Sequence, residues 1–179
     1  LGVSYLAVHE HARPSETASV VSQIARATFP AGSAASFLYY AVQVTTLLIP
    51  GENDSPAEIE ALSAWFAANL GPEVPLHFTA FHPDWKMLDK PRTHVRTLVE
   101  ARRIARAAGL RYVYTGNVHD EPGQSTYCHG CGERLIGRDW YELTAWNLTP
   151  DGRCAACGAP CAGVLEDQPG TWGRRRMPV

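Results

Sequence analysis

The chain has 179 residues, 45% hydrophobic and 19% charged, with a formal net charge of −2. This is the composition of a globular domain, and a charge so close to zero gives no general attraction to nucleic acid or to an anionic membrane. No apolar run approaches the roughly 18 residues of a membrane helix and the start lacks signal-peptide features, so we expect a cytoplasmic protein without nucleic-acid or membrane partners.

Residues 1–41 show the weakest secondary-structure pattern of the chain. They are rich in Ala, Ser, Pro and Arg and show no sustained hydrophobic period. A short helix over 18–27 is the one element that this segment indicates. We therefore treat 1–41 as a poorly defined segment.

Residues 42–115 show alternating strand and helix patterns. The runs 42–49, 75–81 and 110–115 are rich in β-branched and apolar residues and predict strands, the first of them buried. Helices are predicted over 56–70, after the capping candidates Asn53, Asp54 and Ser55, and over 93–108, closed by Gly109. Strand, helix, strand, helix, strand in succession predicts parallel pairing through right-handed crossovers, and hence an α/β fold. Three strands form part of a sheet and do not close a barrel.

Polar residues follow each predicted strand. Because ligands collect at the carboxyl ends of parallel strands, these residues suggest one shared rim. Such residues also commonly end strands and cap helices, which is the simpler interpretation for each one alone. His82 and His119 stand out because imidazole can donate, accept or titrate near neutrality. His77 fits an interior strand position, and His94 fits a solvated helix position. The three rim segments are 50–54, 82–86 and 116–120.

All five cysteines lie between residues 128 and 161. Cys128 and Cys131 form one Cys-x-x-Cys pair, Cys154 and Cys157 form another, and a glycine follows each pair. Two such turns can direct four thiolates at one tetrahedral ion, with no ligand position left open for catalysis. Thiolate sulfur favours zinc or iron over magnesium or calcium. We expect zinc as a structural ion, with iron as the alternative.

Other uses of these cysteines are less favoured. An odd number of cysteines and no signal peptide argue against disulfides, and the glycines after each pair argue against a thioredoxin-like redox site. Cys161 could replace Cys157 as a ligand or be a small buried residue. His129, between two ligands, is too crowded to bind the same ion.

Residues 121–179 are predicted to form a small metal-binding tail. Short strands over 134–137 and 140–146 lie between the cysteine pairs, which is the order of a zinc ribbon. A ribbon of this size depends on its metal for folding. The basic run Arg174 to Arg176 at the end is typical of a solvated terminus. The predicted division is 1–41, 42–120 and 121–179.

Residues from Val42 onward resemble a known enzyme family. The motifs that carry the resemblance are TTLLIPGEND from Thr45, HFTAFHP from His77, YVYTGNV from Tyr112, YCHGCG from Tyr127 and the later Cys-x-x-Cys-Gly. They are similar to the carboxyl-terminal half of the AmmeMemoRadiSam system radical SAM enzymes, which are related to pyruvate formate-lyase activating enzymes. The resemblance implies a partial radical SAM-type (β/α) barrel of about three parallel units, followed by the zinc-ribbon-like tail.

The resemblance also implies a cofactor. Family members use a [4Fe-4S] cluster and S-adenosylmethionine to generate a radical, and His82 matches a histidine near bound S-adenosylmethionine. The cluster ligands form a Cys-x-x-x-Cys-x-x-Cys motif, which occurs nowhere in this chain. We therefore expect a catalytically inactive fragment with an unknown substrate, a protein being one candidate. The unmatched residues 1–41 suggest a different reading frame or a fusion, and translation of neighbouring frames would test this.

Two further expectations follow from the fragment. The open edge of a three-stranded parallel sheet favours association with another chain. The alternative function is a zinc-clipped protein-interaction module without catalysis, since zinc ribbons often serve as structured surfaces alone. A Cys-x-x-x-Cys-x-x-Cys motif encoded upstream would distinguish the enzyme from the module.

Overall fold

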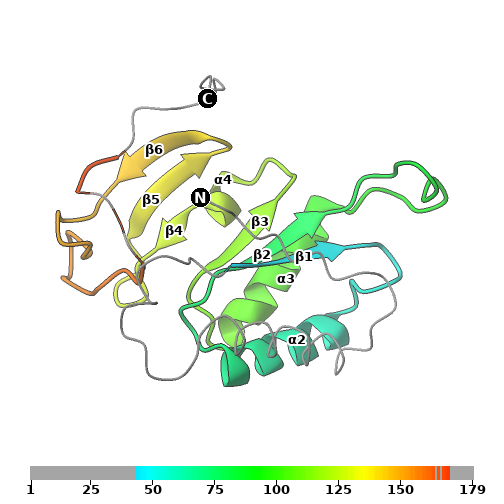
Figure 1. Cartoon of the computed structure of the whole chain (residues 1–179), viewed down its shortest axis with the longest axis horizontal. Helices are drawn as coiled ribbons and strands as arrows, with labels where there is room; N and C mark the ends of the chain where they lie inside the picture. The colour runs from blue at the N-terminus through cyan, green and yellow to red at the C-terminus, as the bar shows by residue number, and fades with distance from the viewer. Residues whose placement is uncertain (1–42, 164, 166, 170–179) are drawn as a thin grey trace, which may run out of the picture.

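A computed structural model describes residues 43–163, 165 and 167–169 of the chain. It contains a parallel sheet with two long helices, followed by a smaller antiparallel sheet (Figure 1). The helix expected over 18–27 and the basic run Arg174 to Arg176 lie outside the described residues.

The first sheet has the predicted parallel topology. Strand β1 (Val44–Leu48), helix α2 (Pro56–Asn69), strand β2 (Leu76–Ala80), helix α3 (Val95–Ala107) and strand β3 (Val113–Gly116) follow one another in the chain. The strand order is β1-β2-β3, with Leu48 opposite Ala80 and Thr79 opposite Gly116. The prediction of an α/β fold with three parallel strands is confirmed.

Local hydrogen bonds set the starts of the two helices. Ser55 caps α2 by accepting from the backbone N–H of Glu58 at 3.3 Å, while its hydroxyl bonds the Glu58 carboxylate at 2.7 Å. The Ser55 hydroxyl thus satisfies the Glu58 N–H, which has no partner within the helix. His94, expected at a solvated helix position, is exposed as expected but caps α3 and does not lie within it. No helix in the described part of the chain has the length and apolar character needed to cross a membrane.

The main core lies between the parallel sheet and its helices. Both helices cover the same face of the sheet (Figure 1), and Phe66 of α2 and Phe78 of β2 are fully buried there. Strand β1 was expected to be a buried strand. Instead its burial alternates, and Leu47 is 43% exposed. The prediction failed because the continuous apolar run of β1 has a helix layer over only one of its faces in the described part of the chain.

The second sheet contains the cysteine pairs. Strand β4 (Thr126–Tyr127) pairs antiparallel with β5 (Arg134–Asp139), and β5 pairs with β6 (Glu142–Trp146). The expected strand over 140–146 starts later, because Trp140 has a left-handed φ of 56° and forms the hairpin turn. The two-residue strand β4 was not predicted, because so short a strand has no periodic pattern.

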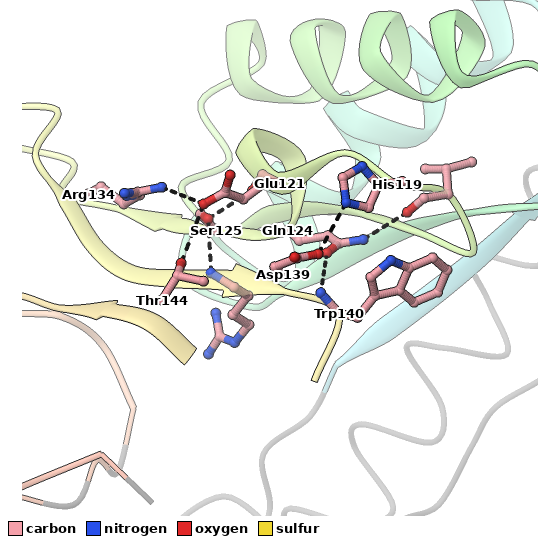
Figure 2. Close-up of polar contacts among 10 residues, drawn as sticks. His119, Glu121, Gln124, Ser125, Arg134, Asp139, Trp140 and Thr144 are labelled. Carbon is pink, nitrogen blue, oxygen red and sulfur yellow. Dashed lines mark hydrogen bonds and ion pairs between the residues drawn. The ribbon is translucent and has the colours of Figure 1, made fainter. Parts of the chain in front are cut away.

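A short helix, α4 (Glu121–Gln124), joins the two sheets and was also not predicted. The Glu121 carboxylate accepts from Arg134 at 2.8 Å, and Gln124 accepts from the backbone N–H of Trp140 at 2.9 Å (Figure 2). The other end of the Gln124 amide donates to the Val118 carbonyl at 2.8 Å. Helix α4 therefore fixes the β5–β6 hairpin against the carboxyl end of β3.

Candidate metal centre

Four cysteine sulfurs converge between the two glycine-bearing turns. The Sγ atoms of Cys128 and Cys157 lie 3.5 Å apart, and those of Cys131 and Cys154 lie 3.7 Å apart. All four sulfurs lie within 4.8 Å of one another. The predicted set of Cys128, Cys131, Cys154 and Cys157 thus forms one group that could hold a metal ion.

The sulfur spacing fits a tetrahedral ion. Ligands at about 2.3 Å from zinc, arranged as a tetrahedron, have sulfurs about 3.8 Å apart, close to the two measured distances of 3.5 and 3.7 Å. A disulfide requires about 2.05 Å, and all five cysteines are free. Among the residues that the structure describes, no other group of three or more His, Cys, Asp or Glu side chains lies close enough to hold a metal.

The two turns share one backbone pattern. The N–H of Cys128 donates to the Glu133 carbonyl and the N–H of Cys154 donates to the Ala159 carbonyl, each at 2.8 Å. Gly132 and Gly158 donate back to the carbonyl of the first cysteine of their own pair, and both have a left-handed φ, 78° and 75°. Glycine adopts this conformation without the steric cost of a Cβ atom. The glycine after each pair is therefore what lets the chain close each turn.

The thiols of this group influence one another's ionisation. Burial opposes ionisation of Cys128, but backbone hydrogen bonds from Cys131 and Gly130, together with neighbouring thiols, lower its pKa to about 7. The backbone hydrogen bond at Glu133 favours the Cys131 thiolate, yet the Cys157 thiol and burial outweigh it and raise the Cys131 pKa to about 12. Close thiols cannot all ionise together unless a cation compensates their charge, which a bound metal would do.

Cys161 lies outside the four-sulfur group. It is 9% exposed, burial raises the pKa of its thiol, and its Sγ lies 3.9 Å from the Tyr112 hydroxyl. That hydroxyl also accepts from the backbone N–H of Ala162 at 2.8 Å. Of its two predicted uses, the structure therefore shows Cys161 as a buried residue beside Tyr112, which precedes β3. His129, expected to be a poor ligand, is exposed.

The polar rim residues meet at one edge of the parallel sheet but have different roles. Asn53 and Asp54, expected as possible helix caps, instead hold the β1–α2 turn, because they accept from the N–H groups of Ile49 and Gly51. Capping is left to Ser55 because the two preceding side chains turn back toward the strand. His82 is exposed, and its Nδ1 lies 2.9 Å from the Pro83 carbonyl.

The structure adds Asp139 and Arg92 to the rim and gives His119 a partner there. His119 pairs with Asp139, its Nε2 lying 3.2 Å from the carboxylate (Figure 2). Asp139 belongs to β5, far along the chain, and no motif links it to the rim. The Arg92 guanidinium donates to the Asn117 carbonyl at 3.0 Å. Both contacts arise from tertiary packing, so sequence spacing gave no signal for them.

Comparison with known proteins identifies a longer relative of this chain. The uncharacterized protein MJ0808 of Methanocaldococcus jannaschii is 42% identical over 125 residues, which are 69% of this chain and 38% of that protein. The chain thus spans well under half of the relative's length, and the relative's name states no activity. No family model matches the chain. No solved structure matches it.

Proposed function

We propose that the four cysteines bind one zinc ion that holds the second sheet together. The observation that carries this proposal is the convergence of four sulfurs within 4.8 Å, from two turns of matching backbone geometry. Four thiolates fill a tetrahedral site, and a filled site is structural. Zinc is favoured over mononuclear iron because it is the commoner ion in such Cys₄ sites and has no redox chemistry to control.

We further propose that the chain is the carboxyl-terminal part of a radical SAM enzyme. Its motifs resemble that family, its β/α units are parallel, and it spans 38% of a longer relative. The residues present do not fit a [4Fe-4S] cluster, because the Cys-x-x-x-Cys-x-x-Cys motif is missing from the sequence and four of the five cysteines belong to the group that we propose binds zinc. Radical chemistry would require cluster ligands from outside this chain.

His82 is the residue of this chain that the proposal assigns to S-adenosylmethionine. It lies two residues after the end of β2, at the carboxyl edge where ligands of parallel α/β sheets bind. Its exposed imidazole leaves Nε2 available, since Nδ1 faces the Pro83 carbonyl. Its role would be to bind and orient the cofactor by hydrogen bonding.

A longer protein tests this proposal. The coding sequence upstream should specify the missing cysteine triplet, and the longer product, reconstituted anaerobically, should contain iron and sulfide and release 5'-deoxyadenosine from S-adenosylmethionine. His82→Gln should weaken S-adenosylmethionine binding, while His129→Gln, an exposed histidine of the ribbon, should not. A longer product with no triplet and no iron would refute the enzyme assignment and leave the zinc assignment untouched.

The second candidate function is a zinc-clipped module that binds another protein. It is favoured by two large apolar side chains in the β2–α3 loop, Trp85 and Leu88, which are 78% and 72% exposed. Exposed aromatic side chains are frequent anchors of protein interfaces. In this case partner binding by the isolated chain would survive His82→Gln and fail in a Trp85→Ala variant.

A further inference from the structure

A pocket of about 390 Å³ opens where the β2–α3 loop meets the loop between β3 and α4. Small-molecule sites commonly have volumes of about 300–1,000 Å³. Its lining residues include one arginine and two histidines and no acidic residue. Neither the zinc site nor the role assigned to His82 uses these groups. The lining residues are Arg92, Thr93, His94, Val95, Val118 and His119.

Arg92 is held at this pocket by the loop on the far side. One of its guanidinium nitrogens donates to the Asn117 carbonyl at 3.0 Å. Asn117 has a left-handed φ of 57°, and its side chain donates to the Ala80 carbonyl at the end of β2, at 2.9 Å. A guanidinium has five N–H donors. The one bond to Asn117 therefore tethers Arg92 across both loops and leaves donors for a ligand.

The two imidazoles each have one nitrogen engaged. His94 Nδ1 accepts from the Arg96 N–H at 3.1 Å, so the neutral ring carries its proton on Nε2 and can donate there. His119 Nε2 faces Asp139, 3.2 Å away (Figure 2). The carboxylate fixes the orientation of the His119 ring and leaves Nδ1 for a ligand. In the neutral rings, His94 therefore has a donor nitrogen available and His119 an acceptor nitrogen, besides the Arg92 donors.

We propose that this pocket binds the phosphate group of a small phosphorylated molecule, through Arg92, His94 and His119. The charge of the lining selects an anion and disfavours a cation. Donors on Arg92 and His94 suit two oxygens of a tetrahedral phosphate, and the acceptor Nδ1 of neutral His119 suits a P–OH group, whereas a planar carboxylate is satisfied by a single guanidinium fork. A metal does not fit here, because the four cysteines are the one metal-holding group in the described part of the chain.

The second sheet helps to build this pocket. Asp139 ends β5, and the following residue, Trp140, is fixed to α4 through Gln124, whose amide also holds the Val118 carbonyl at the pocket wall. His119 is therefore oriented by a strand of the second sheet. Phosphate binding should then require the intact second sheet as well as the loops of the first.

Titration of the full, metal-loaded chain tests the proposal. Inorganic phosphate and glycerol phosphate should each bind saturably by calorimetry and shift the ring nitrogen resonances of His94 and His119. Arg92→Gln should raise the phosphate Kd about tenfold, the loss of one charge-assisted hydrogen bond. The matched control is Arg106→Gln, the same change on an exposed arginine in the last turn of α3, and it should leave the Kd unchanged.

Asp139→Asn gives an independent test. It should weaken phosphate binding, because Asp139 orients the His119 ring, while leaving the lining residues in place. Unfolding curves verify that every variant is folded. Absence of saturable binding to the wild-type chain would overturn the proposal. Equal weakening by Arg92→Gln and Arg106→Gln, or equal affinity for acetate and phosphate, would overturn it too, since either result means general charge attraction.

Discussion

Removal of the metal should unfold the second sheet and leave the parallel sheet folded. The buried aliphatic side chains of the second sheet and its cysteine turns are Leu135, Ile136 and Leu148, which together contribute about 5–9 kcal/mol by burial. A structural zinc ion contributes about 10–16 kcal/mol in small zinc-binding domains. The metal is the larger of these two terms, so the turns should not persist without it. The parallel sheet has its own core around Phe66 and Phe78.

Hydrogen exchange with and without a chelator measures this difference. Protection should be lost at the Gly132 and Gly158 amides, which close the two cysteine turns, and retained at the Leu76 amide, which donates to the Tyr112 carbonyl at 2.9 Å in the parallel sheet. Zinc added back should restore protection at the Gly132 and Gly158 amides. Unchanged protection of Gly132 and Gly158 after complete metal removal would refute the reasoning, because the turns would then be stable on their own.

Three further changes probe how the sheets and the metal site are joined. Tyr112→Phe leaves the Ala162 N–H without its acceptor and should lower the free energy of unfolding by about 1–3 kcal/mol in urea melts. An unchanged free energy of unfolding would mean that this hydrogen bond does not stabilise the fold. Burial raises the pKa of Tyr112 from 10.0 to about 12, so the wild-type chain should lose stability as pH rises from 10 to 12, and Tyr112→Phe should lack this component of the loss. Gly123→Ala places a Cβ atom against the Asp120 and Thr115 side chains. It should lower the free energy of unfolding by about 1–3 kcal/mol and so lower the melting temperature. An unchanged melting curve would contradict this steric conflict. Cys161→Ser should keep the full metal content by elemental analysis, and a loss would return this residue to the ligand set.

The parallel sheet could be predicted because its signals are local. Apolar runs, the Ser55 cap and Gly109, whose φ is 96°, mark each element within a few residues of its end. The exposure of one face of β1 could not be predicted in this way, because burial on both faces of a strand depends on which layers the rest of the chain supplies. The run from Val44 to Leu48 looks the same in either case.

The cysteine group was predictable for a similar reason, and the rim contacts were not. Two Cys-x-x-Cys turns each bring a pair of thiols together within one local unit, so only one long-range approach had to be inferred. The pair of His119 with Asp139 depends on the docking of α4 and on the hairpin register. Asn117 belongs to the rim segment 116–120, yet its side chain donates to the Ala80 carbonyl at the end of β2. Turn-forming residues and ligand-binding residues share the same chemistry, so sequence alone does not separate them.

Metal analysis of the purified chain, beside Cys128→Ser, tests the central claim most directly. A structural zinc site predicts about one zinc per chain, no visible absorbance, and loss of the metal in the variant. A Cys161→Ser control should retain the zinc. Iron with inorganic sulfide and a brown colour, or a metal-free chain with protected cysteine turns, would contradict a structural zinc site built from these four cysteines.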